Sequence, residues 1–283
     1  MKNRIEQLQK TLNGLIAEIN EVKGELSVIY SALDPTSQNF NPVLVENIKN
    51  MDKSNANEFF EIINGALTKL KKDTEAIRVP DGVHTIASSA FSYKKKLAHV
   101  ELPEGLLQIG SQAFAGCENL RTVKLPSTLE SIDSIAFSDC TRLPSIDLPS
   151  SLLTIGSSAF SKCLSLEAVC LPPNLEAINI HAFENCSNLK AIFIPQSVDT
   201  VGANVFLNCP EDLKIYIQGH PDTNEWNRNW NIRNSTGNIA HSNIIYNASR
   251  DEFIKTYINK SSNDGSSSDG TDGIVGINKA WWV

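Results

Sequence analysis

A single phrase recurs through the middle of this 283-residue chain at one constant interval, the step from Phe91 to Phe114. Three residue types mark it: Phe91, Phe114, Phe137, Phe160, Phe183 and Phe206; Pro80, Pro103, Pro126, Pro149, Pro172 and Pro195; and Cys117, Cys140, Cys163, Cys186 and Cys209. A strict period of this length indicates stacked coils, each of them one supersecondary unit. Because no single coil can bury its own apolar side, the coils must pack on one another, and the ends of the stack need caps.

Each coil contains a short extended run followed by a turn. In the run LRTVKLP, Leu120, Val123 and Leu125 lie on one face, and Pro126 ends the strand because it has no N–H for the ladder. Stacked runs would form one parallel sheet with a strand spacing of about 4.8 Å. The turn that follows is expected at a column of residues that tolerate a left-handed backbone, namely Gly110, Asp133, Gly156, Asn179 and Gly202.

The order of these parts is similar to a known family. The motif Leu-x-x-Val/Ile-x-Leu/Ile-Pro, followed by Ile-Gly, Ala-Phe and Cys-x-x-Leu, resembles the BspA-like leucine-rich repeat family with its 23-residue repeats. The resemblance covers about residues 76–217. It implies an α+β chain built on a leucine-rich-repeat solenoid with a parallel β-sheet. It also implies a binding or adhesion module and no enzyme, and it leaves the ligand open.

The cysteine column predicts small buried thiols. A spacing of one full repeat between cysteines matches no metal motif, and no His or Asp shares the column. Parallel side chains in a ladder point the same way, so the five thiols are better suited to packing than to disulfides. Cys170 stands outside the column at an outward position of its strand, and we expect a partly exposed thiol without assigned chemistry.

One side chain in each strand must point away from the core, toward the concave face of the solenoid. Down the stack this column reads Arg78, Glu101, Lys124, Asp147, Cys170, Phe193 and Tyr216. The first four alternate in sign, so neighbouring rungs neutralise one another. The last three, Cys170, Phe193 and Tyr216, are the candidate partner-binding patch of the repeat region. In the alternative interpretation, the C-terminal segment folds over this patch and covers it.

The N-terminal region carries a heptad pattern. Apolar residues alternate at intervals of three and four over residues 1–33, which predicts a coiled-coil oligomerisation helix. The apolar stripe is wide, which favours three or more strands, and we prefer a parallel trimer. In the alternative, the helix packs on the second helix of its own chain as an antiparallel hairpin. The seam consists of Ile5, Leu8, Leu12, Leu15, Ile19, Val22, Leu26, Ile29 and Leu33.

The segment between the seam and the repeats is expected to cap the first coil. Residues 34–75 are interpreted as a linker, broken by two prolines, and a capping helix near residues 43–72. This helix would carry its apolar residues on one side: Phe59, Ile62, Ile63, Ala66 and Leu70.

The C-terminal region divides into a cap and a tail. Residues 218–260 are interpreted as a C-terminal cap in which Trp226 and Trp230 cover the core. Residues 261–283 combine a flexible polar linker with a hydrophobic tail. Trp281 and Trp282 complete the candidate partner-binding residues, because exposed tryptophans should dock on a sister chain, on the repeats or on a partner.

Composition argues against several function classes. The net charge is −7 and no face carries a basic stripe, which disfavours nucleic acid as a partner. The sequence contains no run of about 18 apolar residues, so a membrane-spanning helix is not expected. The five histidines show no ligand or catalytic spacing, and no phosphate loop or nucleophile elbow is found. We therefore expect no enzyme, no cofactor and no metal. The N-terminus lacks a signal-peptide pattern, which predicts a cytoplasmic or virion-associated protein.

These features favour an oligomeric recognition or adhesion protein. A helical stalk would gather copies, and the solenoids would present a surface to a protein or glycan receptor. A stalk followed by a binding module is similar in layout to receptor-binding or fibre proteins of phages and prophages. The alternatives are a cytosolic protein–protein interaction scaffold and an adhesin exported by an unrecognised route.

Overall fold

The chain divides into two compact units, Met1–Asn47 and Ile48–Val283. The computed structural model describes residues 56–219, 226, 229–231 and 243–259, all in the second unit, and the structural statements below refer to these residues. The predicted seam (residues 5–33), most of the linker, and Trp281 and Trp282 lie outside the described residues. No described helix is long and apolar enough to span a bilayer.

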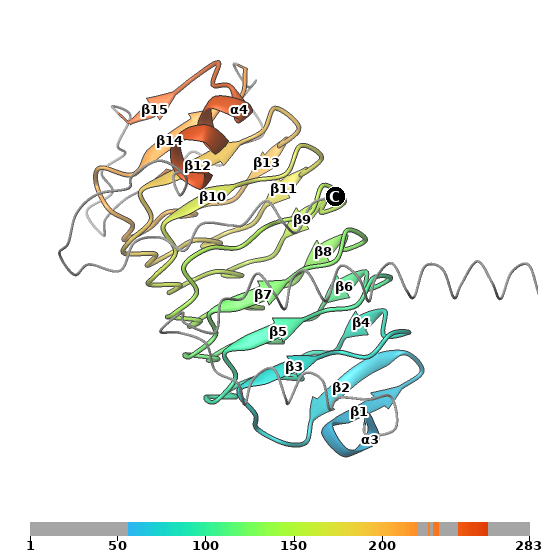
Figure 1. The fold of residues 1–283 in the computed structure, drawn as a ribbon. Coiled ribbons are helices and arrows are strands. Elements are labelled where there is room, and N and C mark those ends of the chain that lie inside the picture. The colour runs from blue at the N-terminus through green and yellow to red at the C-terminus, as the bar shows by residue number, and fades with distance from the viewer. Residues whose placement is uncertain (1–55, 220–225, 227–228, 232–242, 260–283) are drawn as a thin grey trace, which may run out of the picture. The chain divides into compact units, whose positions relative to one another are not determined.

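The described chain is a solenoid whose successive coils stack their short strands on two sides (Figure 1). We call the first the side sheet; it consists of β1 (Phe60–Ile63), β2 (Ala66–Leu70), β4 (Thr85–Ile86), β6 (Gln108–Ile109), β8 (Ser131–Ile132), β9 (Thr154–Ile155), β11 (Ala177–Ile178) and β13 (Thr200–Val201). We call the second the front sheet. It consists of two pieces: β3 (Ala76–Arg78), β5 (His99–Glu101) and β7 (Thr122–Lys124); and β10 (Ala168–Cys170), β12 (Ala191–Ile194), β14 (Lys214–Ile217) and β15 (Ile244–Ile245).

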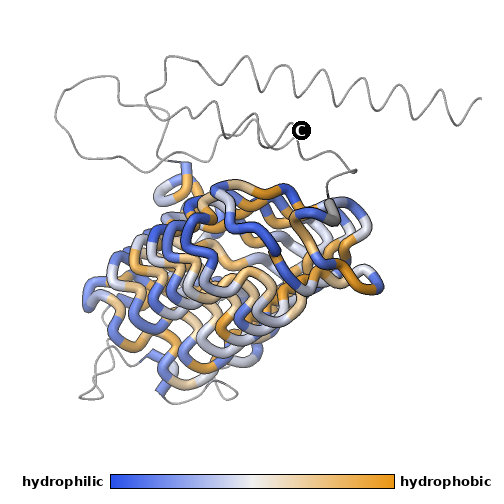
Figure 2. Tube along the Cα trace, turned by 90° about the horizontal axis from the view of Figure 1, so that it is seen from below, coloured by the Kyte–Doolittle hydropathy of each residue, from blue (hydrophilic) through white to orange (hydrophobic). Residues whose placement is uncertain are grey.

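The strand register reproduces the period of the sequence. Within the repeats, partners in both sheets are parallel and lie one repeat period apart, as in Ile77 opposite Val100 and Ile192 opposite Ile215. Because the register is constant, residues of like character stack along the molecule, and the hydropathy pattern repeats from coil to coil (Figure 2). The predicted parallel-sheet solenoid is confirmed.

The centre of the solenoid holds a continuous stack of phenylalanine rings. Successive ring centroids from Phe91 to Phe206 are 4.7–6.0 Å apart, with interplanar angles of 1–15°. All six rings are fully buried. The repeat period therefore places each ring face against the next, and an interior ring has a neighbour on both sides.

The cysteine column is buried and reduced, as predicted, and it makes a contact that the sequence did not reveal. Each Sγ donates to the carbonyl oxygen of a phenylalanine in the preceding coil, at 3.0–3.3 Å. Burial raises the pKa of Cys117 to about 12 and that of Cys140 well above its ordinary value. These two thiols stay protonated at neutral pH, so they serve as small packing groups and weak donors.

The predicted capping helix near residues 43–72 is wrong for its described part. Only α3 (Ala56–Phe59) is helical, and β1 and β2 form an antiparallel hairpin that joins the side sheet through β4. The turn is Asn64–Gly65, with φ values of 49° and 75°. Asn-Gly between apolar runs is a strong hairpin signal, because both central residues need positive φ. Gly65 also lacks room for a side chain, since a Cβ would lie 2.0 Å from the ring of His84.

The expected left-handed column is also corrected. Positive φ occurs two and six residues after the predicted column, and not within it: Ser89, Gln112, Ile135, Ser158, His181 and Asn204; and Tyr93, Gly116, Asp139, Lys162, Asn185 and Asn208. Glycine is needed in the predicted column because the backbone of the preceding coil approaches closely there. A Cβ on Gly156 would lie 2.4 Å from the backbone of Asp133.

Ile135 is the one β-branched residue that the described chain holds at positive φ, at 62°. A β-branched side chain is destabilised by roughly 1–2 kcal/mol in this region, whereas Asn tolerates it. We therefore expect Ile135→Asn to raise the free energy of unfolding by about 1 kcal/mol in chemical denaturation. Ile180→Asn is the matched control, because Ile180 is similarly exposed and lacks positive φ. An equal gain in both variants would contradict the backbone explanation.

Both ends of the solenoid carry covering groups. At the C-terminal end, Trp226 is buried and its Nε1 donates to the carbonyl of Val198 at 3.1 Å. Trp230 packs edge-on against Phe206, the last ring of the stack, at 6.1 Å. Two short helices follow β15, α4 (Arg250–Phe253) and the π-helix η3 (Ile254–Ile258).

Candidate binding face

Alternation along the front-sheet strands directs two columns of side chains outward. In β5, Val100 is buried in the core while His99 and Glu101 point away from it. The equivalent positions define the front face. Its columns are Ala76, His99, Thr122, Ser145, Ala168, Ala191 and Lys214; and Arg78, Glu101, Lys124, Asp147, Cys170, Phe193 and Tyr216.

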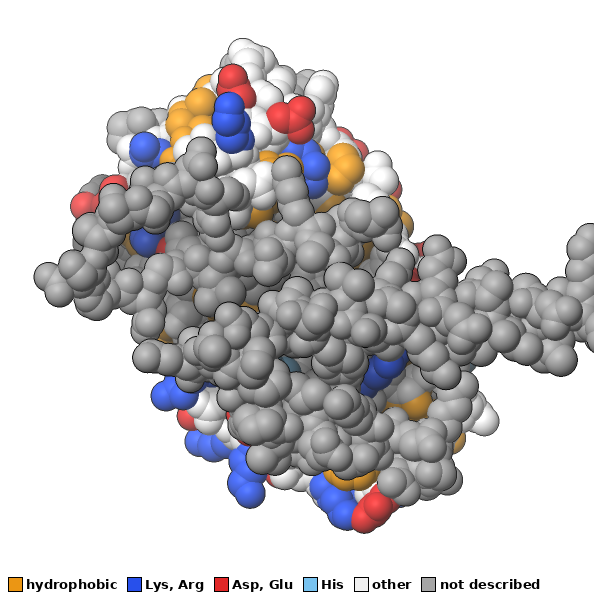
Figure 3. Space-filling model, in the orientation of Figure 1, with side chains coloured by type: hydrophobic (Ala, Val, Ile, Leu, Met, Phe, Trp, Pro, Cys, Tyr) orange, Lys and Arg blue, Asp and Glu red, His pale blue; other side chains and the backbone are white. Residues whose placement is uncertain are grey.

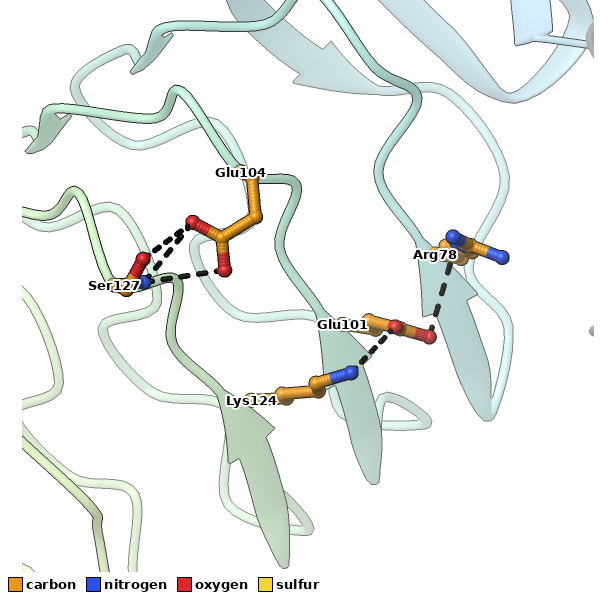
Figure 4. Close-up of polar contacts among 5 residues, drawn as sticks. All are labelled: Arg78, Glu101, Glu104, Lys124 and Ser127. Atoms are coloured by element: carbon orange, nitrogen blue, oxygen red, sulfur yellow. Dashed lines mark hydrogen bonds and ion pairs between the residues drawn. The ribbon is translucent and has the colours of Figure 1, made fainter. Parts of the chain in front are cut away.

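The N-terminal half of this face is charged and internally paired. Glu101 lies between two cations, with Lys124 Nζ at 3.1 Å and Arg78 Nε at 3.9 Å (Figure 4). On the neighbouring turn, the carboxylate of Glu104 accepts from the backbone N–H and hydroxyl of Ser127 (Figure 4). Around the end of the stack nearest β1, blue and red side chains adjoin (Figure 3). Exposed pairs of this kind contribute up to about 1 kcal/mol each, and they leave little net charge to attract an ion.

A break in the front sheet separates the two halves of the face. At the equivalent position in other coils, Arg121 and Lys190 donate their backbone N–H to the preceding coil at 2.8 Å. Pro144 occupies this position in its own coil and has no N–H to donate. No strand forms at residues 145–147 among the described coils, and the sheet divides after β7. Val123, beside the break, is correspondingly less buried than Val100.

His99 occupies the outward column of the charged half. Its Nδ1 lies 2.8 Å from the hydroxyl of Thr122 in the next coil. Burial lowers the pKa of His99, with Glu75 acting in the opposite direction. The ring is therefore neutral at pH 7 and acts as a polar contact between coils.

The C-terminal half of the face is covered by α4 and η3. Phe253 packs on Phe193 and Tyr216, with ring centroids 5.7 and 5.3 Å away. The hydroxyls of Tyr216 and Tyr257 are 2.9 Å apart. Partial burial and this hydrogen bond raise the pKa of Tyr216 to about 12, so its phenol stays protonated at neutral pH. We call residues 250–258 the covering helix.

The expected exposed patch is corrected by this contact. Phe193 points out of the solenoid core, as predicted, but it is fully buried beneath the covering helix. The small side chain of Ala191, in the adjoining column, packs with Phe253 in the same buried cluster. The structure thus matches the alternative in which a C-terminal segment covers the patch. Binding of a partner by Phe193, Tyr216 or Cys170 stays a prediction.

Cys170 lies at the edge of the covered half and is partly exposed. Burial raises its pKa, and the neighbouring Arg250 guanidinium acts against this shift. The thiol is therefore mostly protonated at neutral pH. Its partial exposure makes Cys170 a natural reporter on the covering helix.

The sequence contains a signal for the covering helix that does not follow from the repeat pattern. Ser249 and Glu252 have the spacing of a capping box before apolar Phe253. In the structure, the hydroxyl of Ser249 accepts from the backbone N–H of Glu252 at 3.4 Å. The sequence therefore indicates where the covering helix begins, but it does not indicate which surface the helix packs on.

Comparison with known proteins agrees with this architecture. The BspA type leucine rich repeat region matches in six copies over residues 84–214. A leucine-rich repeat protein of T. pallidum has a similar crystal structure, with 31% identity and a TM-score of 0.55, covering 58% of this chain and 81% of that one. The chain belongs to the BspA-type leucine-rich repeat family.

Two further solved structures are similar to parts of this BspA-type protein. The pneumococcal vaccine antigen PcpA is 23% identical with a TM-score of 0.49, covering 68% of this chain and 49% of that one. A leucine-rich cell surface protein of Faecalibacterium prausnitzii A2-165 is 28% identical with a TM-score of 0.42, covering 56% and 52%. The chain thus spans about half the length of these two proteins. No curated protein matches the sequence significantly.

The BspA-type solenoid is a fold typical of binding proteins. Within the described residues, no group of three His, Cys, Asp or Glu side chains is arranged to hold a metal ion. The side chains that gather on the front face are ion pairs, a neutral histidine and a covered aromatic cluster. What this geometry offers chemically is a surface for contact.

Proposed function

We propose that this protein is a non-enzymatic recognition or adhesion protein that presents its solenoid to a protein or glycan receptor. The observation that supports this most directly is the front face. It combines a rigid, internally neutralised half with an aromatic half under the covering helix. A neutralised polar surface suits hydrogen-bonding partners such as sugars or polar protein surfaces better than free ions.

We further propose that copies associate through the seam from Ile5 to Leu33. Its heptad spacing over residues 1–33 supports a coiled coil, with a parallel trimer preferred. Linked copies would convert weak front-face contacts into strong attachment, because later contacts form at high effective concentration. A stalk followed by a binding module is the layout of phage or prophage receptor-binding fibres, which is the specific role that we propose.

Two aspartate substitutions in the full-length chain test the oligomer. We expect Leu15→Asp, at a seam position, to convert the oligomer to a monomer, because a carboxylate would be buried between helices. Ala17→Asp, outside the seam and two residues away, should leave the oligomer intact. Light scattering coupled to size exclusion gives the masses. A monomeric parent protein, or an oligomer that survives Leu15→Asp, would remove the stalk from the proposal.

Glycan and protein arrays probed with the same three proteins test the binding function. The parent and Ala17→Asp should bind a common set of surface receptors, and Leu15→Asp should lose about 100-fold in apparent affinity through lost avidity. Binding of cytosolic proteins with equal strength by all three would favour the scaffold interpretation. An absence of binding on every array would contradict the recognition function.

A further inference from the structure

The outer surface of the side sheet has no basic residue over five successive coils, and four of these coils carry carboxylates there. We call residues 104–110, 127–133, 150–156, 173–179 and 196–202 the acidic side face. These segments contain no Lys, Arg or His. They contain five carboxylates, Glu104, Glu130, Asp133, Glu176 and Asp199. Charges are therefore segregated by face, because the lysines of these coils lie elsewhere.

Exposed leucines alternate with these carboxylates along the stack. The strands of the side sheet pair in constant register, for example Ser131 opposite Thr154 and Ala177 opposite Thr200. The residues just before them consequently stack in the same way, in the order Leu107, Glu130, Leu153, Glu176 and Asp199. Leu107 and Leu153 are 44% and 36% exposed. The column is thus both acidic and apolar, a combination that folding does not require.

Internal neutralisation distinguishes the front face from the acidic side face. On the front face Glu101 pairs with Lys124, and directly beside that face Glu167 pairs with Lys190. On the side face, no described residue forms an ion pair with Glu130, Glu176 or Asp199. Glu176 and Asp199 also occupy adjacent rungs, where like charges repel.

A shallow hollow runs between the carboxylates of the acidic side face and includes Leu153. Its serine hydroxyls are already committed: Ser151 donates to the carbonyl of Leu129 at 2.6 Å, and Ser197 to that of Leu175 at 2.7 Å. The carboxylate oxygens are left as the strong acceptors. A hollow that offers acceptors and leucines is complementary to a partner with cationic donors and apolar side chains.

We infer that the acidic side face docks a basic, amphipathic protein segment. Rungs lie about 4.8 Å apart, so Glu176 and Asp199 are one rung apart and Glu130 and Glu176 are two. Lys or Arg residues at i, i+7 and i+10 of a helix are separated along its axis by roughly 10 and 5 Å, which matches this spacing. Leucines of the same helix would cover Leu107 and Leu153. This docking site is separate from the front face and does not rest on the function proposed for that face.

A synthetic amphipathic helix of leucine and lysine provides the probe, with fluorescence anisotropy on the full-length protein as the readout. We expect E176Q/D199N to weaken binding about tenfold. The matched control is E101Q/E167Q, with one substitution on the front face and one directly beside it, which changes the net charge equally and should weaken binding less than threefold. Equal losses in the two variants would show that only net charge matters and would overturn the inference.

Stability of the free protein gives a second readout that separates docking from a structural role. Relief of like-charge repulsion should shift the thermal midpoint of E176Q/D199N upward, whereas a structural role would shift it downward. Calcium chloride at millimolar concentration should leave the midpoint of the parent protein unchanged. A calcium-dependent increase that E176Q/D199N abolishes would reveal a metal site instead and would overturn the inference.

Discussion

Phe160→Ala should lower the free energy of unfolding by about 3–5 kcal/mol, the largest effect that we expect for a single substitution in the solenoid. The ring is fully buried, and its centroid lies 5.4 and 5.3 Å from those of Phe137 and Phe183. Its removal leaves a cavity at the centre of the stack and removes two ring contacts, so both adjoining coils lose packing. Urea or guanidinium denaturation followed by circular dichroism measures the loss.

Two matched variants localise the effect of Phe160→Ala to the ring stack. Phe91 is also fully buried but stacks on one ring, Phe114, so Phe91→Ala should cost about 0.5–1.5 kcal/mol less. Leu164 in the same coil is 39% exposed, and Leu164→Ala should cost less than about 1 kcal/mol. Equal losses for Phe91→Ala and Phe160→Ala would show that ring stacking adds nothing to burial.

Phe253→Ala should increase the rate at which Cys170 reacts with a thiol reagent by about 100-fold. Phe253 is the fully buried residue of the covering helix, and it contacts both Phe193 and Tyr216. Loss of about 3 kcal/mol of local packing would raise the population of the open helix by that factor. The chain holds one partly exposed thiol and five buried ones, so mass spectrometry can follow Cys170 alone.

Tyr257→Phe should increase the rate of Cys170 modification less than Phe253→Ala does. It removes the hydroxyl that lies 2.9 Å from that of Tyr216 and keeps the ring, so the rate should rise about fivefold for a hydrogen bond worth about 1 kcal/mol. Cys117, Cys140, Cys163, Cys186 and Cys209 should stay unreactive in both variants. Reaction of all six thiols together would indicate global unfolding, and an unchanged rate at Cys170 would mean that the helix does not control access.

The repeat itself could be predicted because it depends on local pattern and a fixed period. The alternation around Val123 and the recurrence of phenylalanine once in every coil required a parallel ladder with a stacked core, and both are present. The alternating charges of Arg78, Glu101 and Lys124 likewise follow from the period, since residues one repeat apart become neighbours.

The errors arose where one local signal competed with another. Apolar spacing around Phe59 and Leu70 suggested a helix, but the Asn64–Gly65 turn selects a hairpin that extends the side sheet. Glycine in the turn column suggested a left-handed backbone. Gly156 is instead required because the backbone of the preceding coil leaves no room for a Cβ. Glycine has both uses, and sequence alone does not distinguish backbone conformation from steric room.

For this protein the sequence by itself determined the period, the parallel ladder, the buried phenylalanine and cysteine columns, and the membership of the outward column from Arg78 to Tyr216. Tertiary structure alone decided which outward residues are open. Phe193 is covered because Phe253 of the covering helix packs with it and with Ala191, and the front sheet is interrupted where Pro144 cannot donate to its neighbour. The physical reason is range: a repeat dictates contacts between adjacent coils, whereas covering a face depends on contacts between segments that share no period.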